Sequence, residues 1–390
     1  MSEKTAFKLP DVTAAEPIPP SAMSEVNRIL GNGDLYRYTT VESPVAQLER
    51  EFATKIGSRY ALAVASCSAA LFLSLMALDL QPGAKVMIPA FTFVAVPSAV
   101  IHADCVPVLC ECGSNYRIDL DDFRRKLPKV DAVLISHMRG HTSDMDAIMA
   151  ACDAAGVPVV EDAAHSLGTT WDGRKIGTLG KIGCFSFQSY KLLNSGEGGI
   201  MVTDDPDLMA RAIMMHGSYE DKWQHHDIPA DVMARVQNNM PMLGLRLNTL
   251  SAVLIRAQLE HLDQRVLDGR RNHDHVAKRL QALNSVQVPA AHAAELRAPD
   301  SLQFNLPHLS DDEVDAFVSD AKRRGLHIQV FGRSKNNSRA YWNWGFLNDV
   351  PDLPQTRAML MRACDLRLPA RLTLAECDLI ADTLIAALGE

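Results

Sequence analysis

The chain has 390 residues, is 47% hydrophobic and carries a formal net charge of −8 at pH 7. This acidic balance argues against a general nucleic-acid-binding protein, because no broad basic excess is present to neutralise phosphates. The sequence has no run of about 18 consecutive apolar residues, so we expect no membrane span. It also has no apolar signal core near the N-terminus, so we expect no export. The 8 cysteines are scattered and form no CxxC pair, which favours reduced thiols in the cytoplasm over a zinc site.

The first two thirds of the chain alternate short apolar runs with helical stretches. We expect helices at residues 45–56, 69–80, 96–103 and 145–155, and strands at residues 61–65, 85–89, 106–109, 132–136 and 157–160. Short apolar runs separated by helices are typical of a mostly parallel sheet covered on both faces. Ligands of such sheets bind beyond the carboxyl ends of the strands. Asp162 and His165 follow directly on one of these expected ends.

The remainder of the chain predicts a smaller α+β unit. A long helical stretch at residues 250–280 should lead into it, and we expect Gly269 to interrupt or kink this helix. Strands are expected at residues 301–306 and 327–330, and helices at residues 311–323 and 374–388. We place the boundary near residue 260. Residues 1–260 then form an N-terminal segment with a large α/β domain, and residues 261–390 form a small domain.

The residues that carry chemistry gather in one part of the sequence. An apolar run delivers Asp162 at its end, a second expected strand delivers Ser186 and then Lys191, and a glycine-rich loop follows at residues 196–199. Pyridoxal 5'-phosphate (PLP) needs such a set: an amine for a Schiff base, a carboxylate for the pyridine nitrogen, and hydroxyl and amide donors for the phosphate. The sequence therefore predicts a PLP enzyme.

The motifs also occur in the order of a known family. They are Pro89-Ala90-Phe91-Thr92-Phe93, Glu161-Asp162-Ala163-Ala164-His165, Phe185-Ser186-Phe187 with Lys191, and Gly196-Glu197-Gly198-Gly199. This order resembles the DegT/DnrJ/StrS aminotransferases, and the likeness extends nearly end to end. The resemblance implies the PLP-dependent transferase fold type I of the aspartate aminotransferase superfamily. In that fold a large domain, with a mostly parallel seven-stranded sheet between helices, is joined to a smaller α+β C-terminal domain.

The resemblance also implies an activity. Relatives move an amino group from glutamate or glutamine to a keto-sugar, in many cases nucleotide-linked, or to a keto-cyclitol, and they are homodimers with shared active sites. Lys191 would carry the Schiff base with the cofactor. Two alternatives remain open. One is a PLP sugar dehydratase, although those relatives replace the lysine with histidine. The other is a noncatalytic regulator on the same fold, for which an intact Lys191 and Asp162 would be unneeded.

Each expected contact to the cofactor ring has a structural alternative. Asp162 would pair with the protonated pyridine nitrogen; otherwise it would cap a turn or a helix. His165 would contact the ring oxygen or lie on the ring face, and a purely structural histidine is the alternative. Phe91 occupies the place where relatives stack an aromatic side chain on the ring, and its alternative is core packing.

The phosphate is expected at the N-terminus of the helix that follows the first strand. Ser68 offers a hydroxyl group there and Ala69 a backbone amide, while an ordinary serine cap is the compatible alternative. Ser186 is a further phosphate ligand by its position five residues before Lys191. Relatives usually have glycine where this chain has Cys67, so the loop must accept a Cβ atom.

One departure from the family concerns the partner subunit. Relatives often carry Gly-x-Asn-x-Arg before the long helix, and the asparagine reaches the partner's phosphate. Here Gly244 stands at the asparagine position and Arg246 at the arginine position, with Asn248 two residues beyond. We expect Arg246 or Asn248 to serve the partner's cofactor. The alternatives are a surface salt bridge for Arg246 and a helix cap for Asn248.

The substrate contacts are less specific. Tyr36 and Arg37 lie where relatives approach the substrate, and we expect the tyrosine to stack on a sugar or base and the arginine to bind a phosphate or carboxylate. His137 and Arg139 follow an expected strand end and would face the same pocket. A structural loop is the alternative for all four. The carboxylate of the amino donor also needs a cation, for which Arg37, Arg139 and Arg246 remain open.

The adjacent pair His225-His226 lies in a polar stretch with Asp227 beside it. The spacing does not match the H-E-x-x-H pattern of zinc enzymes. We therefore expect no metal ligation by this protein.

Overall fold

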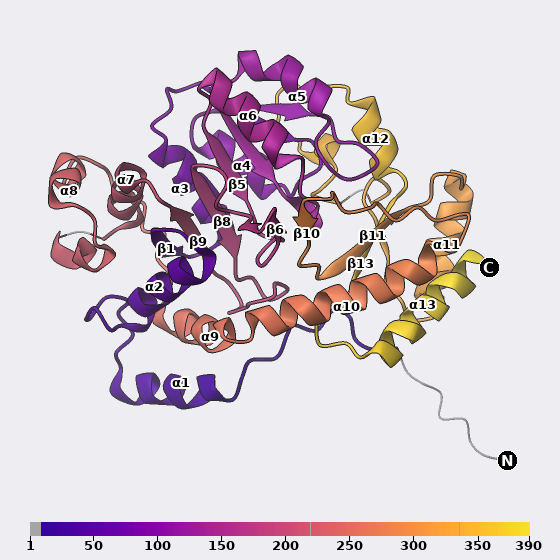
Figure 1. Ribbon diagram of the computed structural model, residues 1–390, viewed down its shortest axis with the longest axis horizontal. Coiled ribbons are helices and arrows are strands. Elements are labelled where there is room, and N and C mark those ends of the chain that lie inside the picture. Colours follow the sequence, from indigo (N-terminus) through magenta and orange to yellow (C-terminus); the bar gives the residue numbers. More distant parts are fainter. Residues whose placement is uncertain (1–8, 219, 335) are drawn as a thin grey trace.

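The computed structural model describes residues 9–390 apart from residues 219 and 335 (Figure 1). Its central sheet has seven strands in the order β1-β9-β8-β5-β4-β2-β3. Their bounds are Tyr60–Val64 (β1), Lys85–Pro89 (β2), Val106–Cys110 (β3), Ala132–Ser136 (β4), Val159–Asp162 (β5), Ile182–Ser186 (β8) and Gly199–Thr203 (β9). Neighbouring strands from β8 to β3 are parallel, and β9 runs opposite to both of its neighbours. The mostly parallel seven-stranded sheet is therefore confirmed.

Helices cover both faces of this sheet. Their bounds are Ser21–Asn32 (α1), Pro44–Ile56 (α2), Cys67–Ala77 (α3), Ala95–His102 (α4), Leu120–Lys126 (α5), Met145–Ala155 (α6), Pro206–His216 (α7), Ala230–Val236 (α8) and Thr249–Leu259 (α9). Alternate strand residues enter two separate cores. In β4, Leu134 packs with the core under α3, α4 and α7, whereas Val133 and Ile135 pack with the core under α2, α6 and α9. Burial on both faces explains the continuous apolar runs of the sequence.

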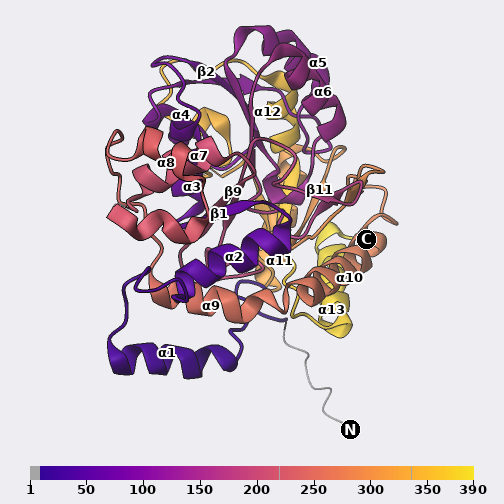
Figure 2. The same ribbon diagram turned by 60° about the vertical axis from the view of Figure 1, so that its left-hand side comes forward.

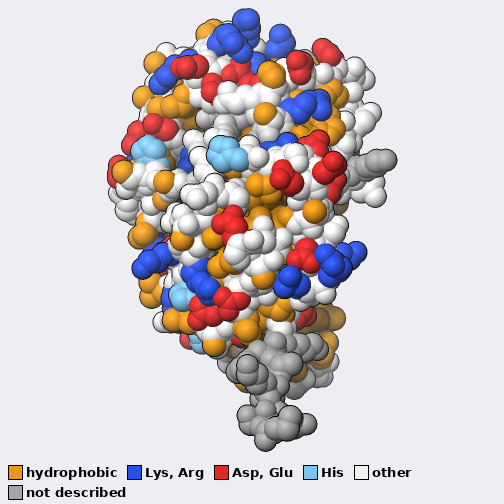
Figure 3. Space-filling model, turned by 90° about the vertical axis from the view of Figure 1, so that its right-hand side faces the viewer, with side chains coloured by type: hydrophobic (Ala, Val, Ile, Leu, Met, Phe, Trp, Pro, Cys, Tyr) orange, Lys and Arg blue, Asp and Glu red, His pale blue; other side chains and the backbone are white. Residues whose placement is uncertain are grey.

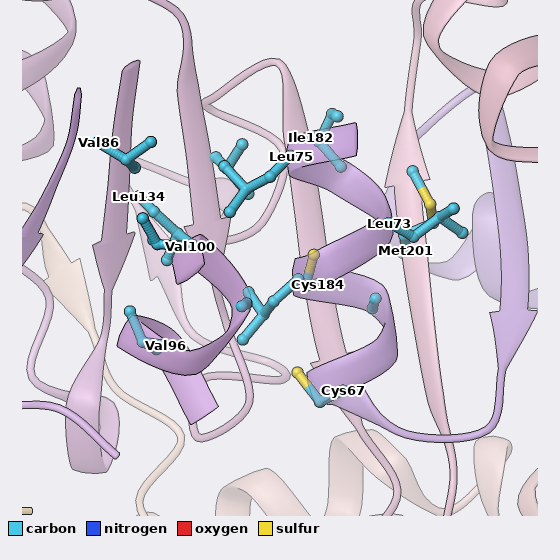
Figure 4. Packing of buried hydrophobic residues seen from close by; sticks show 14 of the residues in the cluster. Cys67, Leu73, Leu75, Val86, Val96, Val100, Leu134, Ile182, Cys184 and Met201 are labelled. Atoms are coloured by element: carbon cyan, nitrogen blue, oxygen red, sulfur yellow. The ribbon is translucent and has the colours of Figure 1, made fainter. Parts of the chain in front are cut away.

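Figure 4 shows the first of these cores at close range. Leu73 and Leu75 of α3 point onto the sheet and share one buried cluster with Ile182 of β8 and Met201 of β9. Val96 and Val100 of α4 continue the same layer toward β2 and β4. The N-terminus of α3 is thereby fixed at the edge of the sheet where the parallel strands end.

The C-terminal part contains a three-stranded antiparallel sheet in the order β11-β13-β12. A further sheet of short strands has the order β10-β6-β7. The bounds are Thr170–Trp171 (β6), Arg174–Lys175 (β7), Glu295–Leu296 (β10), Ser301–Asn305 (β11), Gln329–Val330 (β12) and Ala363–Arg367 (β13), with helices Leu262–Leu280 (α10), Asp311–Arg323 (α11), Pro354–Leu360 (α12) and Leu374–Leu388 (α13). Helices α10, α11 and α13 lie together on this side of the molecule (Figures 1 and 2).

Where the observed bounds of a helix agree with those expected from the sequence, capping residues set the boundaries. Asp144 accepts a hydrogen bond from the Ala147 amide, at 3.0 Å, and so begins α6, and Gly156 ends that helix at a φ of 66°. Ser310 and Glu313 form a capping box at the start of α11. Helices α6, α11 and α13 have the bounds expected from the sequence.

Two expectations about element boundaries were wrong. Strand β5 runs from Val159 to Asp162, so Asp162 is its last residue instead of lying beyond its end. The long helix is divided at residues 260–261 into α9 and α10, and α10 continues through Gly269. A Cβ atom at Gly269 would lie 2.4 Å from the carbonyl oxygen of Pro299. The glycine thus permits a close approach of two segments and does not kink the helix.

The surface on the side of the C-terminal sheet mixes both signs of charge (Figure 3). Arg279, for example, pairs with Asp378 and with Asp382 across α10 and α13. The described residues on this face form no broad field of one sign of the kind that attracts nucleic acids. Among the helices that the structure describes, none is both long and apolar enough to cross a membrane.

Candidate active site

A cavity of about 480 Å³ lies at the carboxyl ends of the parallel strands. Residues that follow β1, β2, β4, β5 and β8 line it, together with the loop that leads into β9. These five strands run in one direction, so their ends meet on one side of the sheet. The cavity also receives Arg339 and Arg367 from the C-terminal part of the chain. It therefore lies where open α/β sheets bind their ligands.

Lys191 and His165 lie side by side in this cavity. The Nζ atom of Lys191 is 2.9 Å from Nε2 and 3.2 Å from Nδ1 of His165. Burial lowers the pKa of Lys191 from 10.5 to about 8, and the Asp300 carboxylate counteracts this effect. Burial, followed by the charge of Lys191, also lowers the pKa of His165 well below its ordinary value. A neutral imidazole thus lies against an amine that gives up its proton more readily than a solvated lysine does.

Asp162 presents a fixed carboxylate to the cavity. Its Oδ2 atom accepts a hydrogen bond from Ser136 Oγ at 2.7 Å, and its Oδ1 atom accepts one from the Ala164 amide at 3.1 Å. The thiol of Cys67 lies 3.9 Å from Oδ1. Because neighbouring strand ends hold both oxygens, the carboxylate is positioned to pair with a cationic group of a ligand.

The N-terminus of α3 opens into the same cavity. Ser66 is its N-cap, and its Oγ atom accepts a hydrogen bond from the Ala69 amide at 3.1 Å. This bond uses the amide that we expected to serve a phosphate, so the expectation for Ala69 was wrong. Cys67 and Ser68, the first two residues of the helix, line the cavity instead. Ser186, the last residue of β8, lies beside them.

The aromatic wall was assigned to the wrong residue. Phe91 is only 1% exposed, packs against Tyr116 and Phe331 with ring centroids 5.6 and 5.0 Å apart, and does not line the cavity. Phe93 lines it instead. The chain turns after β2, so the first phenylalanine enters the core and the second faces the ligand space. Phe91 and Phe93 both belong to the motif identified in the sequence, and their spacing alone does not show which of them faces the cavity.

Of the four expected substrate residues, only Arg139 lines the cavity. Its backbone has a φ of 55°, and its guanidinium forms an ion pair with Asp365. His137 is buried and does not line the cavity, and its Nε2 atom lies 3.1 Å from Oε2 of Glu161 in β5. Arg37 is buried and donates to the carbonyl oxygen of Gly217. These two are structural residues in this chain, which corrects the expectation.

Tyr36 has a different position. Its side chain is 43% exposed and lies outside the cavity of its own chain. The neighbouring Tyr38 is buried and donates to Glu49 Oε1 at 2.8 Å. A contact between Tyr36 and substrate therefore stays a prediction that would have to involve a neighbouring subunit.

Two arginines of the cavity were missed by the sequence analysis. Burial lowers the pKa of Arg339 to about 10, and it lowers the pKa of Arg367 as well. Among the described residues, no carboxylate lies within 4.0 Å of either guanidinium, and Arg339 Nε and Arg367 Nη1 are buried without a hydrogen-bond partner. Arg367 directly precedes the Leu368-Pro369 pair of the family motif, whereas Arg339 carries no local signal.

Asn248 and Arg246, the two candidates for contact with a partner subunit, differ in the hydrogen bonds that they make within their own chain. Asn248 caps α9: its Oδ1 accepts from the Ser251 amide and its Nδ2 donates to Ser251 Oγ, both at 2.9 Å. Arg246 is exposed, and among the described residues its side chain has the thioether of Met242, 4.0 Å away, as its one hydrogen-bond partner. Neither lines the cavity of its own chain. The side chain of Asn248 is therefore already used in the helix cap, and that of Arg246 is more available for contact with a partner subunit.

Comparison with known proteins identifies this architecture. The model of the DegT/DnrJ/EryC1/StrS aminotransferase family matches residues 19–385. The chain is 31% identical to 3-amino-5-hydroxybenzoate synthase of Amycolatopsis mediterranei over 89% of this chain and 88% of the relative. It is 32% identical to a UDP-N-acetyl-3-dehydro-alpha-D-glucosamine 3-aminotransferase of Acidithiobacillus ferrooxidans over 70% of each chain. A crystal structure of 3-amino-5-hydroxybenzoic acid synthase superposes with a TM-score of 0.84 at 26% identity, over 98% of this chain and 100% of the other.

Proposed function

The chain belongs to the DegT/DnrJ/EryC1/StrS aminotransferase family, and from this premise we propose which groups its PLP-dependent reaction uses and which substrates it takes. The amino donor is glutamate or glutamine. The acceptor is a keto-sugar, nucleotide-linked or free, or a keto-cyclitol. The observation that carries the proposal is the convergence of Lys191, Asp162 and the N-terminus of α3 on one cavity.

The residues of the cavity fit PLP. It holds an amine with a pKa of about 8, a carboxylate fixed by two hydrogen bonds, and a helix N-terminus flanked by the hydroxyl groups of Ser68 and Ser186. When bound, PLP supplies an aldehyde that takes up the amino group and a ring that withdraws electrons from the carbon that loses its proton. Ser68, Ser186 and the first amides of α3 would hold the phosphate.

Lys191 would bind the cofactor covalently through Nζ and then act as the base and acid of the reaction. Its lowered pKa makes the free amine far more accessible near neutral pH than in a solvated lysine, which suits both tasks. His165, 2.9 Å from this amine, would lie against the cofactor ring and orient Nζ. Asp162 would hold a proton on the pyridine nitrogen, because a fixed carboxylate stabilises the cationic form of that nitrogen.

Arg339 and Arg367, which enter the cavity from the C-terminal part of the chain, would bind the carboxylates of the amino donor. Arg139 already has Asp365 as a partner, whereas Arg339 and Arg367 have no carboxylate partner among the described residues. Asp365 acts on Arg339 and Asp300 on Arg367 only from beyond ion-pair distance. A bidentate carboxylate of the donor would give each half-buried guanidinium a direct partner. This pair replaces Arg37 and Arg246, which do not reach the cavity of their own chain.

The acceptor class rests on the relatives. Their names describe an aminotransferase of a UDP-linked dehydro-sugar and a synthase of an amino-hydroxybenzoate. Lys191 also distinguishes this chain from the dehydratases that carry histidine at the corresponding position. The test is a spectroscopic screen. L-glutamate or L-glutamine should convert the visible absorbance of the bound cofactor to that of its amine form, and a keto-sugar or keto-cyclitol should restore it. Failure of every donor to change the spectrum would exclude an aminotransferase.

We further propose a homodimer in which each cavity borders the neighbouring subunit. The segment of residues 238–248 exposes Met242 and Leu243 by 54% and 39%, while Arg246 projects beside them. Apolar side chains at the centre of an interface with polar groups at its edge suit a two-fold contact. A cytoplasmic location remains part of the proposal, and all eight cysteines are buried and unpaired.

A further inference from the structure

A second cluster of ionisable side chains lies outside the cavity. Glu49 of α2 meets His225 and His226 of the 3₁₀ helix Glu220–His226. Glu49 Oε2 is 3.1 Å from His225 Nε2 and 3.8 Å from His226 Nδ1. The three ligand atoms all lie within 4.8 Å of one another, and the three side chains are only 3% to 5% exposed. None of them lines the PLP cavity.

The hydrogen bonding of His225 indicates that a proton or a cation is missing between its Nε2 atom and the Glu49 carboxylate. Its Nδ1 atom is 2.8 Å from the carbonyl oxygen of Lys222, which can only accept, so Nδ1 carries the hydrogen. In the neutral ring Nε2 then presents a lone pair to the Glu49 carboxylate. Two lone pairs at 3.1 Å repel each other unless a proton or a metal ion lies between them.

His226 offers the second imidazole of the cluster, with Nδ1 3.8 Å from Glu49 Oε2. His226 Nε2 is buried without a partner among the described residues. With the hydrogen on Nε2, the lone pair of Nδ1 faces the carboxylate at a distance too long for a hydrogen bond.

The carboxylate is held by groups outside the cluster. Tyr38 Oη donates to Glu49 Oε1 at 2.8 Å, and the Ala63 amide donates to the same oxygen at 2.9 Å. The other oxygen, Oε2, is thereby directed to the histidines. The contact of His225 with Lys222 fixes that ring in the same way. Such outer hydrogen bonds orient the ligands of metal sites and set the tautomers of ligating histidines.

We propose that Glu49, His225 and His226 form a structural site for a zinc-class divalent metal ion. Two imidazoles and one carboxylate suit Zn²⁺ or Co²⁺, whereas Mg²⁺ and Ca²⁺ prefer oxygen ligands alone. Small shifts of the side chains would bring all three atoms to about 2.0–2.2 Å from one ion, and water would complete the tetrahedron. The metal would join α2 to the segment that follows α7. The proposal departs from the expectation of no metal, which rested on local spacing, whereas Glu49 lies far from both histidines in the sequence.

The experiment uses the full-length holoenzyme, produced without a histidine tag. After incubation with ZnCl₂ and gel filtration, the unmodified protein should retain about one zinc per chain. Titration with CoCl₂ should produce ligand-field bands at wavelengths longer than the cofactor absorbance. His226→Asn and Glu49→Gln should each lose the zinc and the cobalt bands. His261→Asn, which alters an exposed histidine that also neighbours a glutamate, should keep both.

Thermal unfolding provides a second measurement. A chelator should lower the Tm of the unmodified protein and of His261→Asn, and it should leave the Tm of His226→Asn unchanged. Zinc retention below about one ion in ten chains, or equal retention by His226→Asn and the unmodified protein, would overturn the proposal. That result would leave a protonated His225 paired with Glu49. If Glu49→Gln does not fold, the comparison between His226→Asn and His261→Asn still decides the matter.

Discussion

The lowered pKa of Lys191 can be tested through Asp300, the carboxylate that counteracts the effect of burial. Asp300→Asn keeps the shape of the side chain, and the hydroxyl of Ser301 can still donate to its oxygen. The substitution removes a negative charge that favours the protonated amine. The pKa of Lys191 should therefore fall below the value of about 8 in the unmodified protein.

The consequence for the reactive amine is large. At pH 7 a lysine with its ordinary pKa is deprotonated in roughly 0.03% of molecules, and one with a pKa of about 8 in roughly 10%, because each pKa unit is a factor of ten. The cavity thus increases the fraction of nucleophilic amine by about 300-fold. A further fall of one unit in Asp300→Asn would bring this fraction to about half.

The assay measures the rate at which the apoenzyme binds PLP. Stopped-flow absorbance records this rate at a series of pH values across the alkaline range. The rate should rise with pH around a midpoint near 8 for the unmodified protein and around a lower midpoint for Asp300→Asn. Asp320→Asn, which removes a carboxylate from α11, serves as the control and should leave the midpoint unchanged. A midpoint near 10.5 in the unmodified protein, or a higher midpoint in Asp300→Asn, would refute the reasoning.

Four further predictions concern the roles assigned to single residues. Borohydride reduction of the holoenzyme should fix the cofactor on Lys191, and peptide mapping that finds it on another lysine would overturn the assignment. Asp162→Asn should lower kcat by more than about 100-fold, because an amide cannot stabilise the pyridinium as a carboxylate does; near-normal turnover in a soluble, cofactor-loaded variant would contradict this. Arg367→Gln should raise the KM for glutamate more than it lowers kcat, since a carboxylate contact is lost, and an unchanged KM would remove Arg367 from donor binding. Mixing Lys191→Ala with a variant altered at both Arg246 and Asn248 should restore activity, because one site of the heterodimer keeps an intact lysine and an intact partner segment; no recovery after proven exchange would show that this segment does not complete a neighbouring site.

The sequence predicted those parts of the site that lie within continuous motifs. Asp162 and Ser186 end the buried strands β5 and β8, and Lys191 lies shortly after β8. The parallel arrangement of these strands brings their ends together. Arg339 and Arg367 could not be found in this way, because they reach the cavity only through the docking of the C-terminal sheet. Arg339 carries no local signal, and Arg367 only adjoins the Leu368-Pro369 pair, which does not by itself predict a ligand contact.

The errors have equally local causes. Phe91 and Phe93 are two residues apart, and only the turn after β2 decides which of them enters the core. The break before α10 falls where the apolar spacing of α9 continues, so periodicity does not reveal it. Ala69 was a plausible phosphate donor until its amide was seen to bond the Ser66 cap. Each case depends on hydrogen bonds or packing that no residue pattern specifies.

The contribution of β13 to the cavity has a consequence for the order in which the protein becomes an enzyme during synthesis. Every group assigned to the cofactor leaves the ribosome well before Arg339 and Arg367 do. A nascent chain that has folded its central sheet would already possess the lysine, the carboxylate and the helix end for PLP, but not the proposed site for the donor's carboxylates. Capture of the cofactor can thus precede the ability to use it, because β13, the last strand of the C-terminal sheet to be synthesised, supplies Arg367 to the cavity.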